Sequence, residues 1–245
     1  MAGGAIAMFA DEKSTPGAGR DVVTQVSTYD ALARGLYTGA ATLETLVPHG
    51  DFGVGTLHGW NGEIVLLDGR YHLIDGAGKV TVVTDLSATT PFLQVTWFDA
   101  DHTKRLSDGT TFTTLKTSPT QYLDNVNVLH AVKIKGTFRR LRARSMPTQA
   151  LPYKPMRELV KTQPEFEFTD VEGTLVGFWT PASLQGVGLA GWHLHFLADD
   201  HSGGGHVLSF ETADATLVAD PSPEFRWQIP ATEEYRNTDF GTAAP

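Results

Sequence analysis

Residues 191–210 read GWHLHFLADDHSGGGHVLSF and predict a β-hairpin. The two ends of the segment, residues 191–198 and 206–210, are rich in aromatic and branched apolar residues, which favour strands. The DDHSGGG between them has the composition of a turn. His193 and His195 are two positions apart, so both imidazoles leave the same face of a strand. The hairpin would bring His206 back toward the same point.

Three histidines that converge in this way indicate a metal site. Three imidazoles and one open position are typical of catalytic zinc, because structural zinc sites usually close all four positions with protein ligands. The alternative is that His193, His195 and His206 are ordinary half-buried strand residues, which would suit an HxH pair alone. The third histidine, after a glycine-rich turn, favours the metal. We expect His201 at the exposed tip of the turn, and therefore not as a ligand.

Strand patterns extend outward from this hairpin in both directions. Residues 53–83 alternate strand-like runs with Asn-Gly, Asp-Gly and Ala-Gly turn signals, which predicts an antiparallel meander. Further strands are expected at residues 92–99, 129–145, 165–180 and 206–219. Helices are few: one from Ser27 or Thr28 to a stop at Gly39, and short ones at residues 42–50 and 156–163. The predicted fold class is α+β.

A proline-rich stretch at residues 146–155 interrupts the strand patterns. We therefore expect two domains of mixed, largely antiparallel β-sheet with a few helices. Residues 1–20 would form a flexible leader, residues 21–147 an N-terminal domain, and residues 148–245 a C-terminal domain. The C-terminal domain would carry the three-histidine site and a tail that closes it.

Composition excludes several classes of function. The 245 residues are 41% hydrophobic, enough for a substantial core. The 19 basic and 28 acidic residues give a net charge of -9, which disfavours a nucleic-acid partner and offers no basic patch for a membrane surface. No stretch approaches the roughly 18 apolar residues of a spanning helix. With no cysteine, a metal must be held by imidazole and carboxylate, and a cytoplasmic location fits.

An arginine-rich strand and one glutamate could complete the site. Arg140, Arg142 and Arg144 alternate with apolar residues, so a strand would place all three on one face. Most such faces are simply solvated, but an arginine at the strand's end, such as Arg144, could hold a carboxylate through two parallel hydrogen bonds. Glu63 follows an Asn-Gly turn and begins an apolar strand. It is either a solvated edge residue or an inward-pointing functional group.

Several segments, in the same order, resemble the α-acetolactate decarboxylase family. They are residues 25–74, TPFLQVTWF (90–98), IKGTFRRLRARSMPTQALPYKP (134–155), QPEFEFTDVEGTLVGFWTP (163–181) and GWHLHFLADDHSGGGHVLSFE (191–211). The resemblance implies that His193, His195 and His206 bind zinc and that Arg144 and Glu63 are active-site residues. A second active-site glutamate comes from the tail in this family. Here Glu233 and Glu234 are adjacent, and Glu234, next to an aromatic residue, is favoured.

The implied reaction is the zinc-dependent decarboxylation of (S)-2-acetolactate to (R)-acetoin and CO2, the work of a carboxy-lyase. The substrate is a small 2-hydroxy-3-oxo acid, whose ketone and hydroxyl oxygens can chelate one zinc ion. Zinc would stabilise the enediolate that forms as CO2 leaves. Arg144 would pair with the carboxylate, and Glu63 or Glu234 would protonate the enediolate. Both glutamates are therefore candidates for the proton donor.

Two other classes fit parts of the pattern. Cupin-like oxygenases or isomerases also use an HxH pair and a distant histidine, but usually with a glutamate shortly after the pair, and none lies between His195 and His206. A non-catalytic metal-binding module with the same fold is the other class, against which Glu63 and Arg144 argue. The family resemblance also implies a homodimer.

Overall fold

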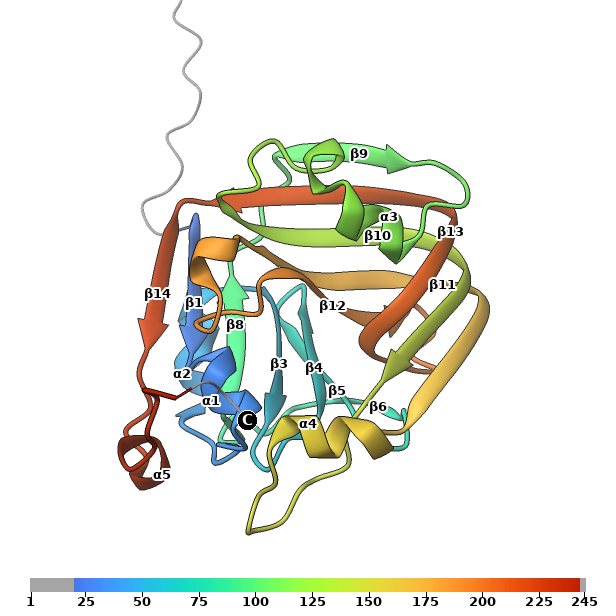
Figure 1. Cartoon of the computed structure of the whole chain (residues 1–245). Helices are drawn as coiled ribbons and strands as arrows, with labels where there is room; N and C mark the ends of the chain where they lie inside the picture. Colours follow the sequence, from blue (N-terminus) through green and yellow to red (C-terminus); the bar gives the residue numbers. More distant parts are fainter. Residues whose placement is uncertain (1–19, 243–245) are drawn as a thin grey trace, which may run out of the picture.

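The computed structural model describes residues 20–242, in which β-strands predominate over a few short helices (Figure 1). The leader expected at residues 1–20 lies outside this part of the chain, apart from its last residue. The sheets are largely antiparallel, which confirms the predicted α+β class. Within residues 20–242, no helix has the length and apolar character needed to cross a membrane.

A seven-stranded sheet contains the predicted meander, and its strand order is β14-β1-β8-β3-β4-β5-β6. Strands β3 to β6 pair antiparallel in chain order. At the β4–β5 turn Asp68 and Gly69 both have positive φ, 50° and 74°, as a tight two-residue hairpin turn requires. The strands are β1 (Val22–Val26), β3 (Phe52–Leu57), β4 (Asn61–Leu67), β5 (Arg70–Ile74), β6 (Val80–Val82), β8 (Phe92–Thr96) and β14 (Glu224–Gln228).

One pairing in this sheet was not predicted. Strand β14, near the C-terminal end of the described chain, pairs parallel with β1, near its start. The other pairings of the sheet are antiparallel. The side chains of β14 are largely exposed, so the strand forms an edge of the sheet.

A five-stranded sheet, in the order β10-β11-β12-β13-β9, carries the hairpin. Strand β10 pairs with β13 as well as with β11, so four of the strands close on themselves. Apolar side chains such as Phe138, Leu175, Phe196 and Leu217 fill the interior of this closed arrangement. The strands are β9 (His102–Leu106), β10 (Leu129–Arg144), β11 (Glu165–Thr180), β12 (Gly191–Ala198) and β13 (Gly204–Ser222).

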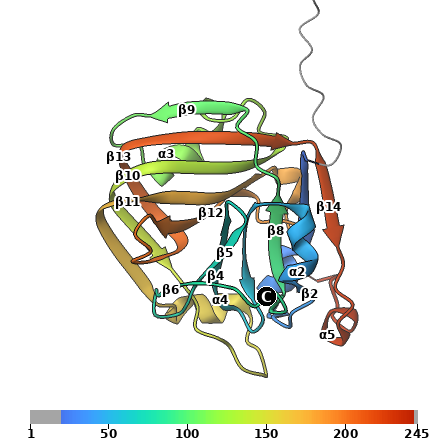
Figure 2. The same cartoon turned by 180° about the vertical axis from the view of Figure 1, so that it is seen from behind.

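The two sheets pack against each other, with the strands of one running across those of the other (Figures 1 and 2). Phe52 and Val54 of β3 share a hydrophobic cluster with Val176 and Phe178 of β11. The second half of β11 is buried almost throughout because one face lines this cluster and the other faces the interior of the five-stranded sheet. The interface between the sheets is thus a continuous apolar core.

Each sheet takes strands from both sides of the boundary expected at residues 147–148. Strands β9 and β10 precede it but belong to the five-stranded sheet, whereas β14 follows it and joins the seven-stranded sheet. The proline-rich stretch is a connection between β10 and the next helix, and it divides neither sheet. The reason is that β10 pairs with β11 and β13, and β14 pairs with β1, so both strands take their partners from the other half of the chain.

The helices are all short. Thr28 caps α1 (Tyr29–Ala33), since its hydroxyl accepts a hydrogen bond from the Ala31 N–H at 3.1 Å. This confirms the predicted start, but the helix ends before Gly35, which has a φ of 96°, and not at Gly39. The other α-helices are α2 (Leu43–Leu46), α3 (Phe112–Thr117), α4 (Met156–Leu159) and α5 (Glu233–Arg236). Short 3-10 helices lie at Val47–His49, Pro119–Gln121, Val160–Thr162 and Ala182–Leu184. A small two-stranded sheet consists of β2 (Ala41–Thr42) and β7 (Thr89–Thr90).

Candidate active site

The hairpin of β12 and β13 has the predicted form. His195 and His206 are direct cross-strand partners, and the turn lies between them. Gly205, next to His206, has a φ of 135°, and a Cβ there would lie 2.4 Å from the backbone oxygen of Arg144, so only glycine suits this position. His201 is exposed in the turn with a φ of 58°, and it is not part of the histidine cluster.

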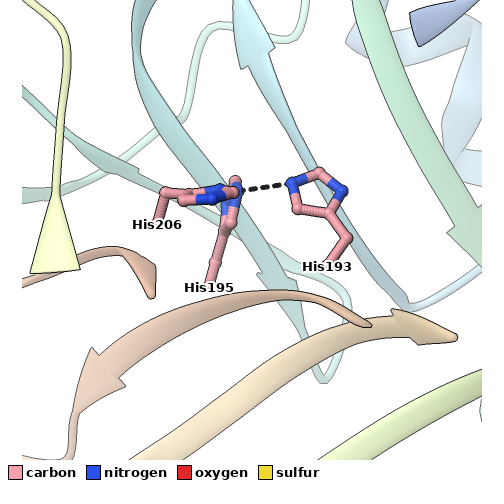
Figure 3. Close-up of side chains that lie close together, drawn as sticks. All are labelled: His193, His195 and His206. Atoms are coloured by element: carbon pink, nitrogen blue, oxygen red, sulfur yellow. Dashed lines mark hydrogen bonds between the residues drawn. The ribbon is translucent and has the colours of Figure 1, made fainter. Parts of the chain in front are cut away.

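The three histidines point toward one another (Figure 3). Their candidate ligand atoms all lie within 4.8 Å of one another. The Nε2 atoms of His193 and His195 are 3.2 Å apart. Two nitrogens on one tetrahedral zinc, each bonded at 2.0–2.1 Å, would be separated by about 3.3 Å. The arrangement therefore fits a single metal ion without rearrangement of this pair.

The surroundings keep all three imidazoles neutral, as metal binding requires. Burial is the largest cause that lowers the pKa of each ring, to about 4 for His193 and well below the usual value for His195 and His206, and the nearby charge of Arg144 adds to it. Nδ1 of His195 lies 2.9 Å from the carbonyl oxygen of Ile64. A proton on Nδ1 satisfies that carbonyl and leaves the Nε2 lone pair free for a metal.

Glu63 reaches the histidines from the other sheet. It lies on β4 and is only 5% exposed, with Oε2 3.4 Å from Nε2 of His195. Burial raises the pKa of its carboxyl to about 8, against the opposing effects of Arg144 and Trp60. A bound dication would lower this pKa again. Of the two interpretations left open by the sequence, the structure favours the inward-pointing group.

Arg144 is the arginine that the strand brings to the site. It ends β10 directly opposite His206 of β13, and it is half-buried, whereas Arg140 and Arg142 are exposed. Nη2 of Arg142 donates a hydrogen bond to Oε2 of Glu165 at 2.6 Å. Of the three alternating arginines, only Arg144, at the end of the strand, lines the site, and its two neighbours are solvated.

These groups surround one cavity of about 220 Å³. Its polar wall includes the three histidines, Glu63 and Arg144, and its apolar wall includes Leu32, Trp60 and Phe92. The size suits a small molecule, and the few convergent polar groups on an apolar lining are typical of a ligand pocket. Sequence patterns missed this apolar wall, because it is assembled from α1, β8 and the β3–β4 turn, which are brought together only by the packing of the fold.

Comparison with known proteins agrees with this architecture. The profile of the family described as alpha-acetolactate decarboxylase matches residues 23–242. The chain belongs to this family. A relative named alpha-acetolactate decarboxylase from Methanosarcina mazei is 41% identical over 221 residues, which cover 90% of this chain and 76% of that protein. One from Brevibacillus brevis is 36% identical, covering 90% and 77%. The resemblance seen in the sequence and the assignment to the carboxy-lyase enzymes are thereby confirmed.

Solved structures of the family share the fold. The crystal structure of alpha-acetolactate decarboxylase from Bacillus subtilis strain 168 aligns with a TM-score of 0.87 at 33% identity, covering 90% of this chain and 94% of that one. A Staphylococcus aureus protein described as similar to alpha-acetolactate decarboxylase aligns with a TM-score of 0.84 at 32% identity, covering 89% and 94%. Neither comparison favours the cupin-like alternative.

The structure does not bring the tail glutamates of this family member to the cavity. Among the described residues, none after His206 lines it. Glu234 lies on α5 and is half-buried, while Glu233 is exposed. The reason is the route of the chain, since β14 runs along β1 at the edge of the seven-stranded sheet and α5 follows beyond α1. Tyr235, next to Glu234, interacts there with Thr28 at the start of α1.

Proposed function

We propose that this protein converts (S)-2-acetolactate to (R)-acetoin and CO2, with a zinc ion held by His193, His195 and His206. The observation that carries the proposal is the meeting of three neutral imidazoles, a buried carboxyl group and a guanidinium around one small cavity. Membership of the family supports the same reaction. The predicted homodimer, the cytoplasmic location and the lack of a nucleic-acid or membrane partner remain predictions.

The donor set is suited to zinc, because neutral imidazoles are among its preferred ligands and the described cluster leaves a position for substrate. A zinc ion held by these histidines would act as a Lewis acid and stabilise the negative charge that develops on the substrate as CO2 leaves. The protein's contribution is to hold the three rings in place. The carbonyl of Ile64 does this for His195 through a 2.9 Å contact.

Arg144 is the group we assign to the substrate carboxylate. Its guanidinium borders the cavity together with Glu63 and the histidines. A planar guanidinium can hold a carboxylate through two parallel hydrogen bonds, which also orients the bond that breaks. As that bond breaks, the carboxylate becomes neutral CO2 and its electron pair moves toward the ketone. The pairing with Arg144 then weakens, which favours release of CO2.

Glu63 is the proton donor we propose. After CO2 has left, the carbon that carried it must receive a proton to give acetoin. Glu63 lies beside His195 and is shielded from solvent, so a proton on its carboxyl is directed at the cavity. Delivery from one side of the cavity would give a single enantiomer. Trp60 and Phe92 are buried neighbours in the cavity wall and restrict access of water as a competing donor.

We place Glu234 outside the catalytic group, contrary to the expectation from the family's tail. The test is a matched pair of variants: Glu63→Gln should lose turnover, whereas Glu234→Gln should keep turnover within about twofold. A large loss in Glu234→Gln with a normal metal content would return the tail glutamate to the mechanism.

The function itself is tested by adding racemic acetolactate to purified, zinc-loaded protein and measuring CO2 and acetoin. Chiral chromatography should show one acetoin enantiomer. Removal of the metal with a chelator should abolish CO2 release, and zinc should restore it. Full activity in a preparation shown by elemental analysis to be free of metal would refute the zinc proposal.

A further inference from the structure

The guanidinium of Arg144 contacts a neutral protein group. Its Nη1 donates a hydrogen bond to the amide oxygen of Gln163. Its Nε is buried and has no hydrogen-bond partner among residues 20–242. Over the same residues, Arg144 forms no ion pair with a carboxylate. The charge of Arg144 is therefore not compensated by a direct protein contact.

A carboxylate that could neutralise the charge of Arg144 lies nearby. Glu165 of β11 is the direct cross-strand partner of Arg144. Its carboxylate is instead held by Arg142, whose Nη2 donates to Oε2 at 2.6 Å. The amide nitrogen of Gln163 lies 3.4 Å from the other carboxylate oxygen, Oε1. Glu165 thus accepts hydrogen bonds from Arg142 and Gln163, and among residues 20–242 it forms its ion pair with Arg142 and none with Arg144.

Glu165 is ionised in this setting, so its position decides whether it neutralises the charge of Arg144. The hydrogen bond from Arg142 is the largest cause that lowers the pKa of Glu165, followed by the hydrogen bond from Gln163. If this carboxylate turned to Arg144, it would form the planar, two-bond pair that guanidinium and carboxylate groups prefer. An incoming substrate carboxylate would then have to displace it.

We infer that Gln163 is a positioning residue that holds the Arg144 guanidinium through a neutral contact. Arg142 supports this arrangement by holding the carboxylate of Glu165. Arg144 therefore stays free to bind the carboxylate of the substrate. The inference rests on the proposed function, in which Arg144 binds that carboxylate. It assigns a role to two residues outside the cavity wall. It also explains why a strand with several arginines uses only one of them at the site.

The first test compares Gln163→Glu with Gln163→Met. Glutamate places a carboxylate on Arg144, whereas methionine is similar in size and neutral but gives up the hydrogen bond. Gln163→Glu should raise KM by about 10-fold or more, the usual strength of a hydrogen bond to a charged group, with a much smaller change in kcat. Gln163→Met should change KM by no more than about threefold. Zinc content and thermal unfolding should match the wild type in both variants.

The second test uses rescue. Arg142→Gln releases Glu165 and should raise KM about two- to fivefold, as expected for a partly exposed ion pair. Adding Glu165→Gln to that variant should restore the wild-type KM. Glu167→Gln is the control, because Glu167 is an exposed neighbour of Arg142 that does not face Arg144 across the strands. It should leave KM unchanged.

Binding of 2-hydroxy-2-methylpropanoate, a carboxylate without the ketone, separates this inference from the proposed function. Calorimetry should show weaker binding to Gln163→Glu than to Gln163→Met, whether or not acetolactate is turned over. Equal affinities and equal KM values for these two variants would overturn the inference while leaving the decarboxylase proposal intact. The other outcome separates the two claims in the opposite direction. If the zinc-loaded wild type were inactive while the ligand still bound more weakly to Gln163→Glu than to Gln163→Met, the decarboxylase proposal would be overturned.

Discussion

Asp220 on β13 should make the protein less stable as the pH rises, and Asp220→Asn should remove that effect. The side chain is 1% exposed. Its Oδ2 accepts a hydrogen bond from the Asp99 N–H at 3.0 Å, and its Oδ1 is buried without a partner among the described residues. Burial, the largest cause, and the charges of Asp101, Asp21 and Asp99 together raise the pKa of this carboxyl from 3.8 to about 7, against the opposing effect of the Asp99 hydrogen bond.

The sign and size follow from proton linkage. Between the unfolded and folded pKa values the folded protein retains a proton that the unfolded chain has released, so stability falls as the pH rises through this window. For a folded pKa of about 7 and an unfolded value of 3.8, the loss between pH 5 and pH 8 is about 3 kcal/mol, at 1.36 kcal/mol for each pH unit. Asparagine keeps an oxygen for the Asp99 N–H but adds an amide that lacks a buried acceptor, at a cost of about 1–3 kcal/mol.

Urea unfolding of the wild type and Asp220→Asn at pH 5 and pH 8 measures this effect. From pH 5 to pH 8, the free energy of unfolding of the variant should rise by about 3 kcal/mol relative to that of the wild type, whatever the absolute stability of the variant. Taking the difference between the two proteins cancels the contributions of the histidines and other carboxyls. A relative stability that stays constant from pH 5 to pH 8 would show that Asp220 is already ionised in the folded protein, and the reasoning from burial would fail.

The remaining predictions concern the site. His206→Ala should lose both zinc and CO2 release, while His201→Ala should keep about one zinc per chain and full activity, as measured by elemental analysis and a CO2 assay. Glu63→Gln should keep the metal but lower turnover by about 10² to 10⁴, the range of general acid catalysis, and a wild-type rate would exclude it as donor. Arg144→Lys should lower kcat/KM by about 10- to 100-fold because an ammonium cannot form the planar pair, whereas Arg140→Lys should change it by less than twofold. Equal losses at both positions would indicate a diffuse electrostatic effect.

The parts of the fold that could be predicted from sequence are those fixed by local chemistry. The β12–β13 hairpin follows from alternating apolar residues around a glycine-rich turn, and with it the alignment of His195 and His206. The meander follows from turns such as Asp68–Gly69, and the start of α1 from the cap at Thr28. In each case, the signal and the structure it specifies lie within a few residues of one another.

What could not be predicted depends on contacts between distant segments. Glu63 meets the histidines because β4 packs on β12, and no periodicity indicates which faces of two sheets come together. The strand β14 carries mostly exposed side chains, so it lacks the alternation that marks a half-buried strand. Without its pairing to β1, the route of the tail could not be foreseen, and Glu234 was expected at the site on family resemblance alone.

The parallel pairing of β1 with β14 has a consequence for how the protein is made. Val22 and Glu224 are register partners about two hundred residues apart. During synthesis, β1 has no outer neighbour until the residues of β14, about two hundred positions later, have left the ribosome. Until then one edge of the seven-stranded sheet offers unpaired backbone groups, a template for association with other nascent chains. The seven-stranded sheet therefore cannot be completed before residues 224–228 are translated, and chains released before β14 is made would be prone to aggregate even though all three histidines are present.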